Sequence, residues 1–114
     1  MLSRTHRFHG LNSLSFAYRH GQVVRGPELA LKYSLNKRRQ TYRVAVVVSK
    51  KVDKSAVVRN RIRRRVYEAF RTLDSTVSQP YDLIFTVFSS QVATMPMPEL
   101  QQQIRKRLRQ ASAI

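Results

Sequence analysis

Cysteine is absent from this 114-residue chain, and glycine and acidic residues are scarce. Without cysteine there is no disulfide framework, thiolate zinc site, iron–sulfur cluster or cysteine nucleophile. The three scattered glycines form no glycine-rich phosphate loop. The longest aliphatic run, residues 44–48, is far shorter than the roughly 20 residues of a membrane span. The sequence therefore predicts one compact domain, residues 1–114, with no membrane helix.

The acids and histidines form no catalytic or metal-binding pattern. The six acids lie far apart in the sequence: Glu28, Asp53, Glu68, Asp74, Asp82 and Glu99. Acid–base catalysis and two-metal nucleases use close pairs, so we expect Asp53 and Asp82 to cap the backbone or pair with arginine. His6, His9 and His20 lack a carboxylate or cysteine partner at ligand spacing. We therefore predict no metal site and no catalytic residue in the protein.

Basic residues are abundant. The chain has 16 Arg and 6 Lys against 6 acids, which gives a formal net charge of +16. Positive charges at this density repel one another in a compact chain, and they indicate an anionic partner. The planar fork of arginine suits phosphate oxygens and guanine edges better than a lysine ammonium does. Nucleic acid is thus the leading partner, and the 42% hydrophobic content argues against a disordered polycation.

The N-terminal part of the chain predicts a short helix within residues 12–21. Leu14, Ala17 and Tyr18 fall at i, i+3 and i+4, and a glycine follows. The first 27 residues carry four arginines and no acid, which a mitochondrial presequence would also show. Because Gly10 and Gly21 interrupt them as in a folded segment, we expect these residues to belong to the domain.

Several later segments have the alternating pattern of strands. Residues 28–36 alternate apolar and polar side chains, and residues 41–49 are β-branched enough for a central strand. We expect these two to pair antiparallel. Residues 81–88 are apolar on both faces, so this strand should be covered on both sides. Val23 and Val24 form a candidate edge strand.

Two amphipathic helices complete the pattern. Residues 55–73 place an apolar stripe around Ile62, with Asn60, Arg64, Tyr67 and Arg71 on the opposite face. A final helix after Pro98 carries four basic residues on its predicted outer face: Arg105, Lys106, Arg107 and Arg109. The order α-β-β-β-α-β-α indicates an α+β fold, a small single-domain two-layer sandwich with a βαβ crossover.

Five of the seven residues from Arg59 to Arg65 are arginine. Helical spacing spreads them over more than half of the circumference, where like charges at i, i+4 oppose one another. A solvated helix does not require this density, whereas a polyanion relieves the repulsion. The alternative is a merely solvated basic face.

The segment Val48 to Phe70 contains SKKV, then AVVRNRIRRRV and the helical tail YEAF. It closely resembles the protein subunit of bacterial ribonuclease P. The resemblance runs from about Arg7 to Leu108 and includes the early Tyr-Arg-His-Gly sequence at residues 18–21. Arg-Asn-Arg alone is not specific, but its position after SKK and AVV and before a basic helix is.

The resemblance implies an accessory protein of an RNA-catalysed endonuclease that removes the 5′ leader from precursor tRNA. The chemistry would belong to the RNA and to Mg²⁺ that the RNA holds. The implied partners are the catalytic RNA subunit and precursor tRNA in the cytoplasm, with no membrane and no obligate protein partner. The resemblance also implies a left-handed crossover, whereas general topology favours the right-handed form. The implied RNA-subunit contacts are Lys50, Lys51, Arg59, Asn60, Arg61, Arg63, Arg64 and Arg65.

The resemblance further implies a cleft between the first helix and the sheet, in which aromatic and basic side chains hold the single-stranded leader. The candidate leader contacts are Leu14, Phe16, Tyr18, Lys32, Tyr33 and Arg43. Phe16 is either core or a shifted contact, and for Tyr33 a core position is the better interpretation. The choice between Lys32 and Tyr33 depends on which face of their strand lines the cleft.

Two departures from the family pattern affect this cleft. Leu14 stands where many members carry an aromatic residue. Residues 88–91, Phe-Ser-Ser-Gln, stand where many carry a basic pair, so this loop should attract RNA less.

Two other functions remain as alternatives. A basic RNA-binding protein of ribosomal type would bind structured RNA without distinguishing precursor from mature tRNA. A protein-only nuclease would cleave without an RNA subunit and would depend on its own histidines or acids.

Overall fold

The computed structural model describes residues 6–8, 14 and 18–114. The predicted first helix agrees with it where the two overlap, since residues 14 and 18–20 are helical. None of the described helices is long and apolar enough to cross a membrane. The other elements are β1 (Gln22–Arg25), β2 (Leu29–Leu35), β3 (Arg43–Val48), α2 (Ala56–Arg71), the 3-10 turn η2 (Asp74–Thr76), β4 (Tyr81–Val87), the 3-10 turn η3 (Ser90–Ala93) and α3 (Met97–Gln110).

The strands form one sheet in the order β1-β2-β4-β3. β2 is antiparallel to both β1 and β4, whereas β3 runs parallel to β4. The predicted pairing of residues 41–49 with 28–36 is therefore wrong, because β4 lies between them. The strand pattern shows which faces are buried but not which strand is the neighbour. Val23 and Val24 do lie in an edge strand, as predicted.

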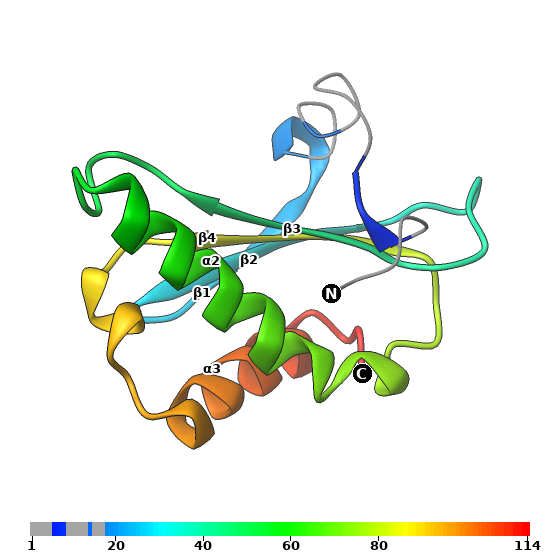
Figure 1. The fold of residues 1–114 in the computed structure, drawn as a ribbon. Coiled ribbons are helices and arrows are strands. Elements are labelled where there is room, and N and C mark those ends of the chain that lie inside the picture. The colour runs from blue at the N-terminus through cyan, green and yellow to red at the C-terminus, as the bar shows by residue number, and fades with distance from the viewer. Residues whose placement is uncertain (1–5, 9–13, 15–17) are drawn as a thin grey trace.

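The helices α2 and α3 cover one face of the sheet, and the helical turn of residues 18–20 lies on the other side (Figure 1). The stripe predicted for α2 is confirmed, since Ile62, Val66 and Phe70 have no exposed surface. Phe70 packs against Phe85 of β4, with 5.9 Å between ring centroids. The main core therefore lies between α2, α3 and the sheet face that carries Phe85.

The start of α2 is capped by side chains from the preceding turn. The Ser55 hydroxyl accepts a hydrogen bond from the Val58 amide at 3.3 Å. Asp53 Oδ1 in turn accepts from the Ser55 amide at 2.8 Å, which confirms the capping role predicted for Asp53. Caps of this kind satisfy amides that a helix start leaves unpaired, so the turn sets where the basic helix begins.

Helix α3 departs from its predicted pattern at Arg107. This residue is 5% exposed, although the helical pattern assigned it to the outer face. Its guanidinium occupies the space beside Gly26, where a Cβ atom would overlap it. Gly26 precedes β2 in the chain but lies against α3, and periodicity within the helix carries no information about this distant glycine.

Residues 6–8 attach to the edge of β3. Arg7 forms a parallel bridge with Val44, and the His6 ring stacks on Tyr42 with 4.0 Å between centroids. The Tyr42 hydroxyl donates to Asp74 Oδ2 at 3.2 Å. Burial, and secondarily the Asp74 carboxylate, raise the pKa of the Tyr42 phenol well above its ordinary value. Tyr42 therefore stays protonated and links the start of β3 to η2.

A buried ion pair joins β3 to β4. Arg43 donates to both carboxylate oxygens of Asp82, from Nε at 2.9 Å and from the second terminal nitrogen at 3.0 Å. Asn36 Nδ2 lies 3.1 Å from Asp82 Oδ2, and the Arg43 guanidinium lies 4.4 Å from the Phe8 ring centroid. The arginine partner predicted for Asp82 is thus confirmed. The side chains are only 12% and 5% exposed, so neither charge has much access to water.

We expect Asp82→Ala to lower the free energy of unfolding by about 3–5 kcal/mol, because the Arg43 charge would remain buried without its partner. Chemical denaturation measures the loss. Glu68→Ala is the matched control: its pair with Arg71 is 3.8 Å long and exposed, so its removal should cost at most about 1 kcal/mol. Equal effects of the two substitutions would contradict a structural role for the buried pair.

Candidate nucleic-acid interface

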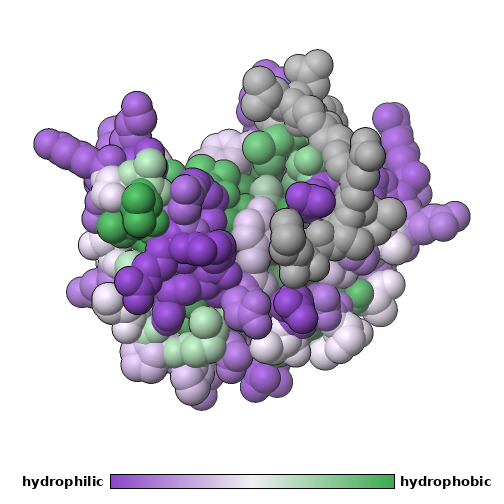
Figure 2. Space-filling model, in the orientation of Figure 1, coloured by the Kyte–Doolittle hydropathy of each residue, from purple (hydrophilic) through white to green (hydrophobic). Residues whose placement is uncertain are grey.

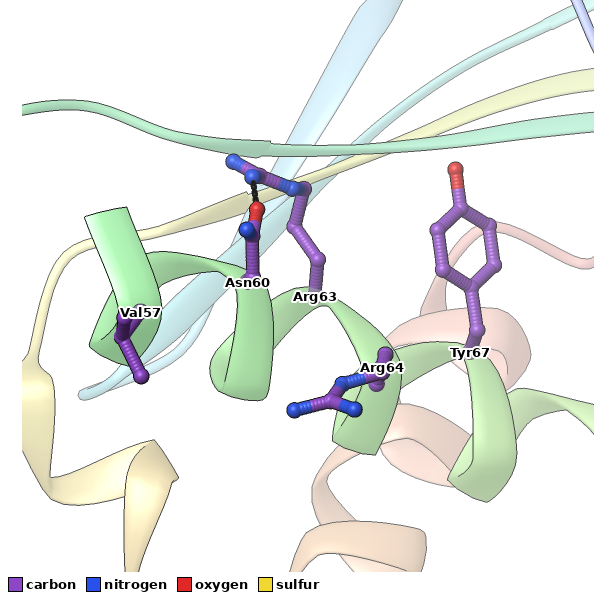
Figure 3. Close-up of a pocket in the computed structure, with 5 residues that line it drawn as sticks. All are labelled: Val57, Asn60, Arg63, Arg64 and Tyr67. Carbon is purple, nitrogen blue, oxygen red and sulfur yellow. Dashed lines mark hydrogen bonds between the residues drawn. The ribbon is translucent and has the colours of Figure 1, made fainter.

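The outer side of α2 carries an open hollow of about 450 Å³. Asn60 and Arg63 lie side by side above the helix, joined by a hydrogen bond from the guanidinium to the amide oxygen, and Arg64 points away from them (Figure 3). Val57 and Tyr67 complete the lining. Val57 is 74% exposed, so its side chain adds apolar surface that is open to solvent. The hollow thus combines cationic, amide and apolar surface.

Tyr67 is half-buried and packs against the core, although the helical wheel assigned it to the outer face. Burial raises the pKa of its phenol, while the backbone of Val46 and the charges of Arg63 and Arg7 act in the opposite direction. Sequence reasoning missed Val57 and Tyr67 as members of this hollow. The sequence did contain a signal for Val57, because this apolar residue lies outside the predicted apolar stripe of the helix.

The five arginines of residues 59–65 differ in what they contact. Arg59 donates to the carbonyl oxygens of Asp53 and Lys54, each at 2.9 Å. Arg65 donates to the carbonyl oxygens of Val92, at 3.0 Å, and Met95. These two guanidiniums attach the neighbouring loops to α2 and have fewer donors left for a ligand.

Arg61 and Arg64 are exposed and make no hydrogen bond or ion pair with another described residue. Lys50 and Lys51 are also exposed, in the turn between β3 and α2 that Arg59 holds. Hydrophilic surface extends across the front of the molecule, where α2 runs (Figure 2). We call the surface formed by Lys50, Lys51, Asn60, Arg61, Arg63 and Arg64 the α2 surface, whereas Arg59 and Arg65 hold the loops beside it.

The opposite side of the sheet carries an aromatic ring with a cation over it. Lys32 Nζ lies 4.0 Å from the centroid of the Tyr18 ring, and Tyr18 is 41% exposed. Tyr33 instead packs against the core and donates its hydroxyl to Gln22 Oε1 at 3.0 Å, as the core interpretation predicted. Lys32 is therefore the β2 residue that shares a face with Tyr18.

The structure describes two of the three remaining predicted leader contacts, Leu14 and Arg43. Leu14 is helical and half-buried, and Phe16 lies outside the described residues. Arg43 lies on the same sheet face as Lys32, but its fork is occupied by Asp82. The upper surface in Figure 2 is hollowed to the right of the loop after β3, with hydrophobic atoms on its floor.

Most of the positive charge cannot be neutralised within the chain, because 22 Lys and Arg residues face six acids; among the described residues, ion pairs join Arg43 to Asp82 and Arg71 to Glu68. Fold and surface together define a small, strongly basic α+β protein with an arginine-rich helix on one side of its sheet and an aromatic–cation pair on the other. Residues 2–112 match the model of the family described as Ribonuclease P. The chain belongs to this family.

Individual relatives agree with the family assignment. The ribonuclease P protein component of Roseiflexus castenholzii is 32% identical over 113 residues, which cover 99% of this chain and 91% of that protein. That of Chloroflexus aurantiacus is 46% identical over 74 residues, covering 65% of this chain and 54% of that protein. The chain thus spans only about half the length of the Chloroflexus relative.

Solved structures share the fold. The RNase P protein of Staphylococcus aureus superposes with a TM-score of 0.81 at 24% identity, covering 95% of this chain and 96% of that one. The RNase P protein from Thermotoga maritima gives 0.80 at 17% identity, covering 91% and 96%. At these identities the likeness establishes the architecture alone, and it agrees with the predicted α+β domain.

We expect Arg65→Ala to lower the free energy of unfolding by about 2 kcal/mol, because hydrogen bonds from a charged donor hold the η3 segment against α2. Arg64→Ala, one residue earlier and exposed, should change it by less than about 0.5 kcal/mol. Urea denaturation of both variants makes the comparison. If Arg65→Ala were as stable as Arg64→Ala, the contacts with Val92 and Met95 would not hold the loop.

Proposed function

We propose that this protein is the protein component of a cytoplasmic ribonuclease P ribonucleoprotein, and that it assists a catalytic RNA in removing the 5′ leader from precursor tRNA. The α2 surface binds the RNA subunit, and the opposite sheet face, with Tyr18 and Lys32, binds the leader. The observation that carries the proposal is the presence of two cationic surfaces on opposite sides of one small sheet. Such a protein can contact two RNA segments at once and reduce the repulsion between them.

Each predicted contact has a distinct part in this proposal. Arg61, Arg64, Lys50 and Lys51 are available to bind phosphate oxygens, and the linked pair Asn60–Arg63 presents donors in the hollow beside them. Arg59 and Arg65 act mainly as positioning residues, because they hold the loops on either side of α2. Arg43 positions β3 against β4.

The chemistry is proposed to reside in the RNA and in the Mg²⁺ ions that it holds. Four of the six acids already have partners in the protein: Asp53, Asp74, Asp82 and Glu68. No group of three or more histidines and acids within the described residues could hold a metal ion. The protein therefore contributes binding and orientation, which raise the effective concentration of substrate and catalytic RNA.

The proposal is tested by following cleavage of precursor tRNA at low Mg²⁺ in four reactions: protein alone, a bacterial ribonuclease P RNA alone, both together, and neither. Cleavage that is stimulated only when both are present supports the accessory role. Cleavage by the protein alone would indicate a protein nuclease. If the protein bound the RNA but gave no stimulation, a ribosomal type of RNA-binding protein would be the better description.

Binding of the RNA subunit should depend on salt through individual phosphate contacts. We expect Arg61→Ala and Arg64→Ala each to lower the slope of log K against log salt concentration by about 0.7–0.9, which corresponds to one phosphate. Arg105→Ala, an exposed change on α3, serves as control and should leave the slope unchanged. Unaltered slopes for both α2 variants would contradict the assignment of the α2 surface.

Leader binding should depend on the Tyr18 ring. Tyr18→Ala is expected to weaken binding of precursor tRNA relative to mature tRNA by about 1–3 kcal/mol, because a base that stacks on the ring loses its platform. Tyr18→Phe keeps the ring and should retain the preference. Titration of both tRNAs into the assembled complex measures it, and equal losses for the two tRNAs would show that Tyr18 acts structurally.

A further inference from the structure

Phe88 is a large aromatic side chain that remains 39% exposed at the end of the central strand β4. The amide of Phe88 donates to the Glu28 carbonyl at 2.8 Å, so the strand pairing with β2 continues to this residue. Val87 pairs with Leu29, and both are buried in the core between sheet and helices. Because successive side chains alternate, Phe88 lies on the opposite face, which is the face of Tyr18 and Lys32.

Phe88 also has a cation over its ring. The Arg25 guanidinium carbon lies 4.6 Å from the ring centroid. Arg25 is exposed and belongs to the edge strand β1, where it pairs with Ala30 of β2. The sheet face therefore carries two exposed aromatic rings with a basic side chain over each, Lys32 of β2 over Tyr18 and Arg25 of β1 over Phe88.

The strand register gives the spacing of the two pairs. Lys32 lies opposite Ile84, and Phe88 follows four residues later on β4. Four residues of strand rise span on the order of 13 Å. Between them the register places Ala30 beside Thr86, two small side chains. Because Arg25 pairs with Ala30, two residues from Lys32, the two pairs lie up to about 13 Å apart, a distance that a strand of up to about four stacked nucleotides at ~3.4 Å each covers.

The charges of this face favour a polyanion. Arg25 and Lys32 are both basic, and the carboxylate of Asp82 on the same face is already paired with Arg43. Glu28, whose carbonyl accepts from the Phe88 amide, is the acid beside the second ring, and one of its carboxylate oxygens is buried without a hydrogen-bond partner among the described residues. The basic residues near the two rings therefore still outnumber the unpaired acid. Aromatic rings with adjacent cations are typical platforms for single-stranded nucleic acid, since every base has a face that can stack.

We propose that Phe88 and Arg25 form a second stacking site for single-stranded RNA, so that this protein holds the leader at two separate bases. The inference rests on the proposed function and adds a second leader contact to it. Sequence reasoning treated the Phe-Ser-Ser-Gln segment only as a loss of charge, because the partner of Phe88 comes from a strand about 60 residues away.

The test uses the protein assembled with a bacterial ribonuclease P RNA. Precursor tRNAs with one tRNA body carry leaders that are shortened by one nucleotide at a time. Phe88→Ala should weaken binding of the longest precursor about fivefold or more and leave mature tRNA unaffected. As the leader shortens, the effects of Phe88→Ala and Tyr18→Ala should disappear at different lengths, up to about four nucleotides apart.

Matched variants separate stacking from folding. Phe88→Tyr keeps the ring and should bind like the unsubstituted protein, whereas Phe88→Leu keeps the apolar bulk and should lose affinity like Phe88→Ala at unchanged stability. Leu35→Ala is the control, because Leu35 is 41% exposed at the opposite end of β2. By strand alternation, its side chain lies on the sheet face that the helices cover. It should leave leader binding unchanged.

Three results would overturn the second site: no effect of Phe88→Ala at any leader length, an equal effect on mature tRNA, or loss of both effects at one leader length. If Tyr18→Ala still weakens precursor binding in the first case, the proposed function stands and only the Phe88 site is wrong. If neither variant changes precursor binding, the leader-binding function itself fails along with the second site.

Discussion

The fold depends on one constraint, the apolar character of β4 on both of its faces. A strand of this kind must be covered on both sides, and β4 is buried at five of its seven positions. It also pairs on both of its edges, with β2 on one side and β3 on the other, and so occupies an inner position of the sheet. Since β3 runs parallel to β4, the connection must cross over the sheet, and α2 is that crossover.

The crossover explains why one helix can be both a core element and a cationic surface. Ile62, Val66 and Phe70 bury one side of α2 against the sheet. The arginines are then distributed over the remaining surface, where those near the loops donate to backbone carbonyls and the others stay exposed. Repulsion among them is reduced where a guanidinium is bound to a carbonyl, and elsewhere it favours an anionic ligand.

The leader-binding face depends on contacts between elements that are far apart in the chain. Lys32 reaches the ring of Tyr18, and Arg25 reaches the ring of Phe88, across different strands. Tyr33 and Lys32 are adjacent in sequence but serve opposite faces, one packed on the core and the other on the aromatic ring. Because side chains alternate along β2, Tyr33 contributes to the stability of the core and Lys32 contributes to the binding face.

Local sequence patterns were enough to predict the class of fold, the extents of the long helix and most strands, the apolar stripe of α2 and the family. These properties follow from local periodicity and from a contiguous motif, SKKV with AVVRNRIRRRV, which need no information about distant residues. Only the tertiary structure decided that β4 separates β2 from β3, that Arg107 is buried beside Gly26, and that Arg59 and Arg65 hold loops while Arg61 and Arg64 remain exposed. The physical reason is that strand order, burial of a single charge and the partner of a guanidinium depend on residues brought together from different parts of the chain.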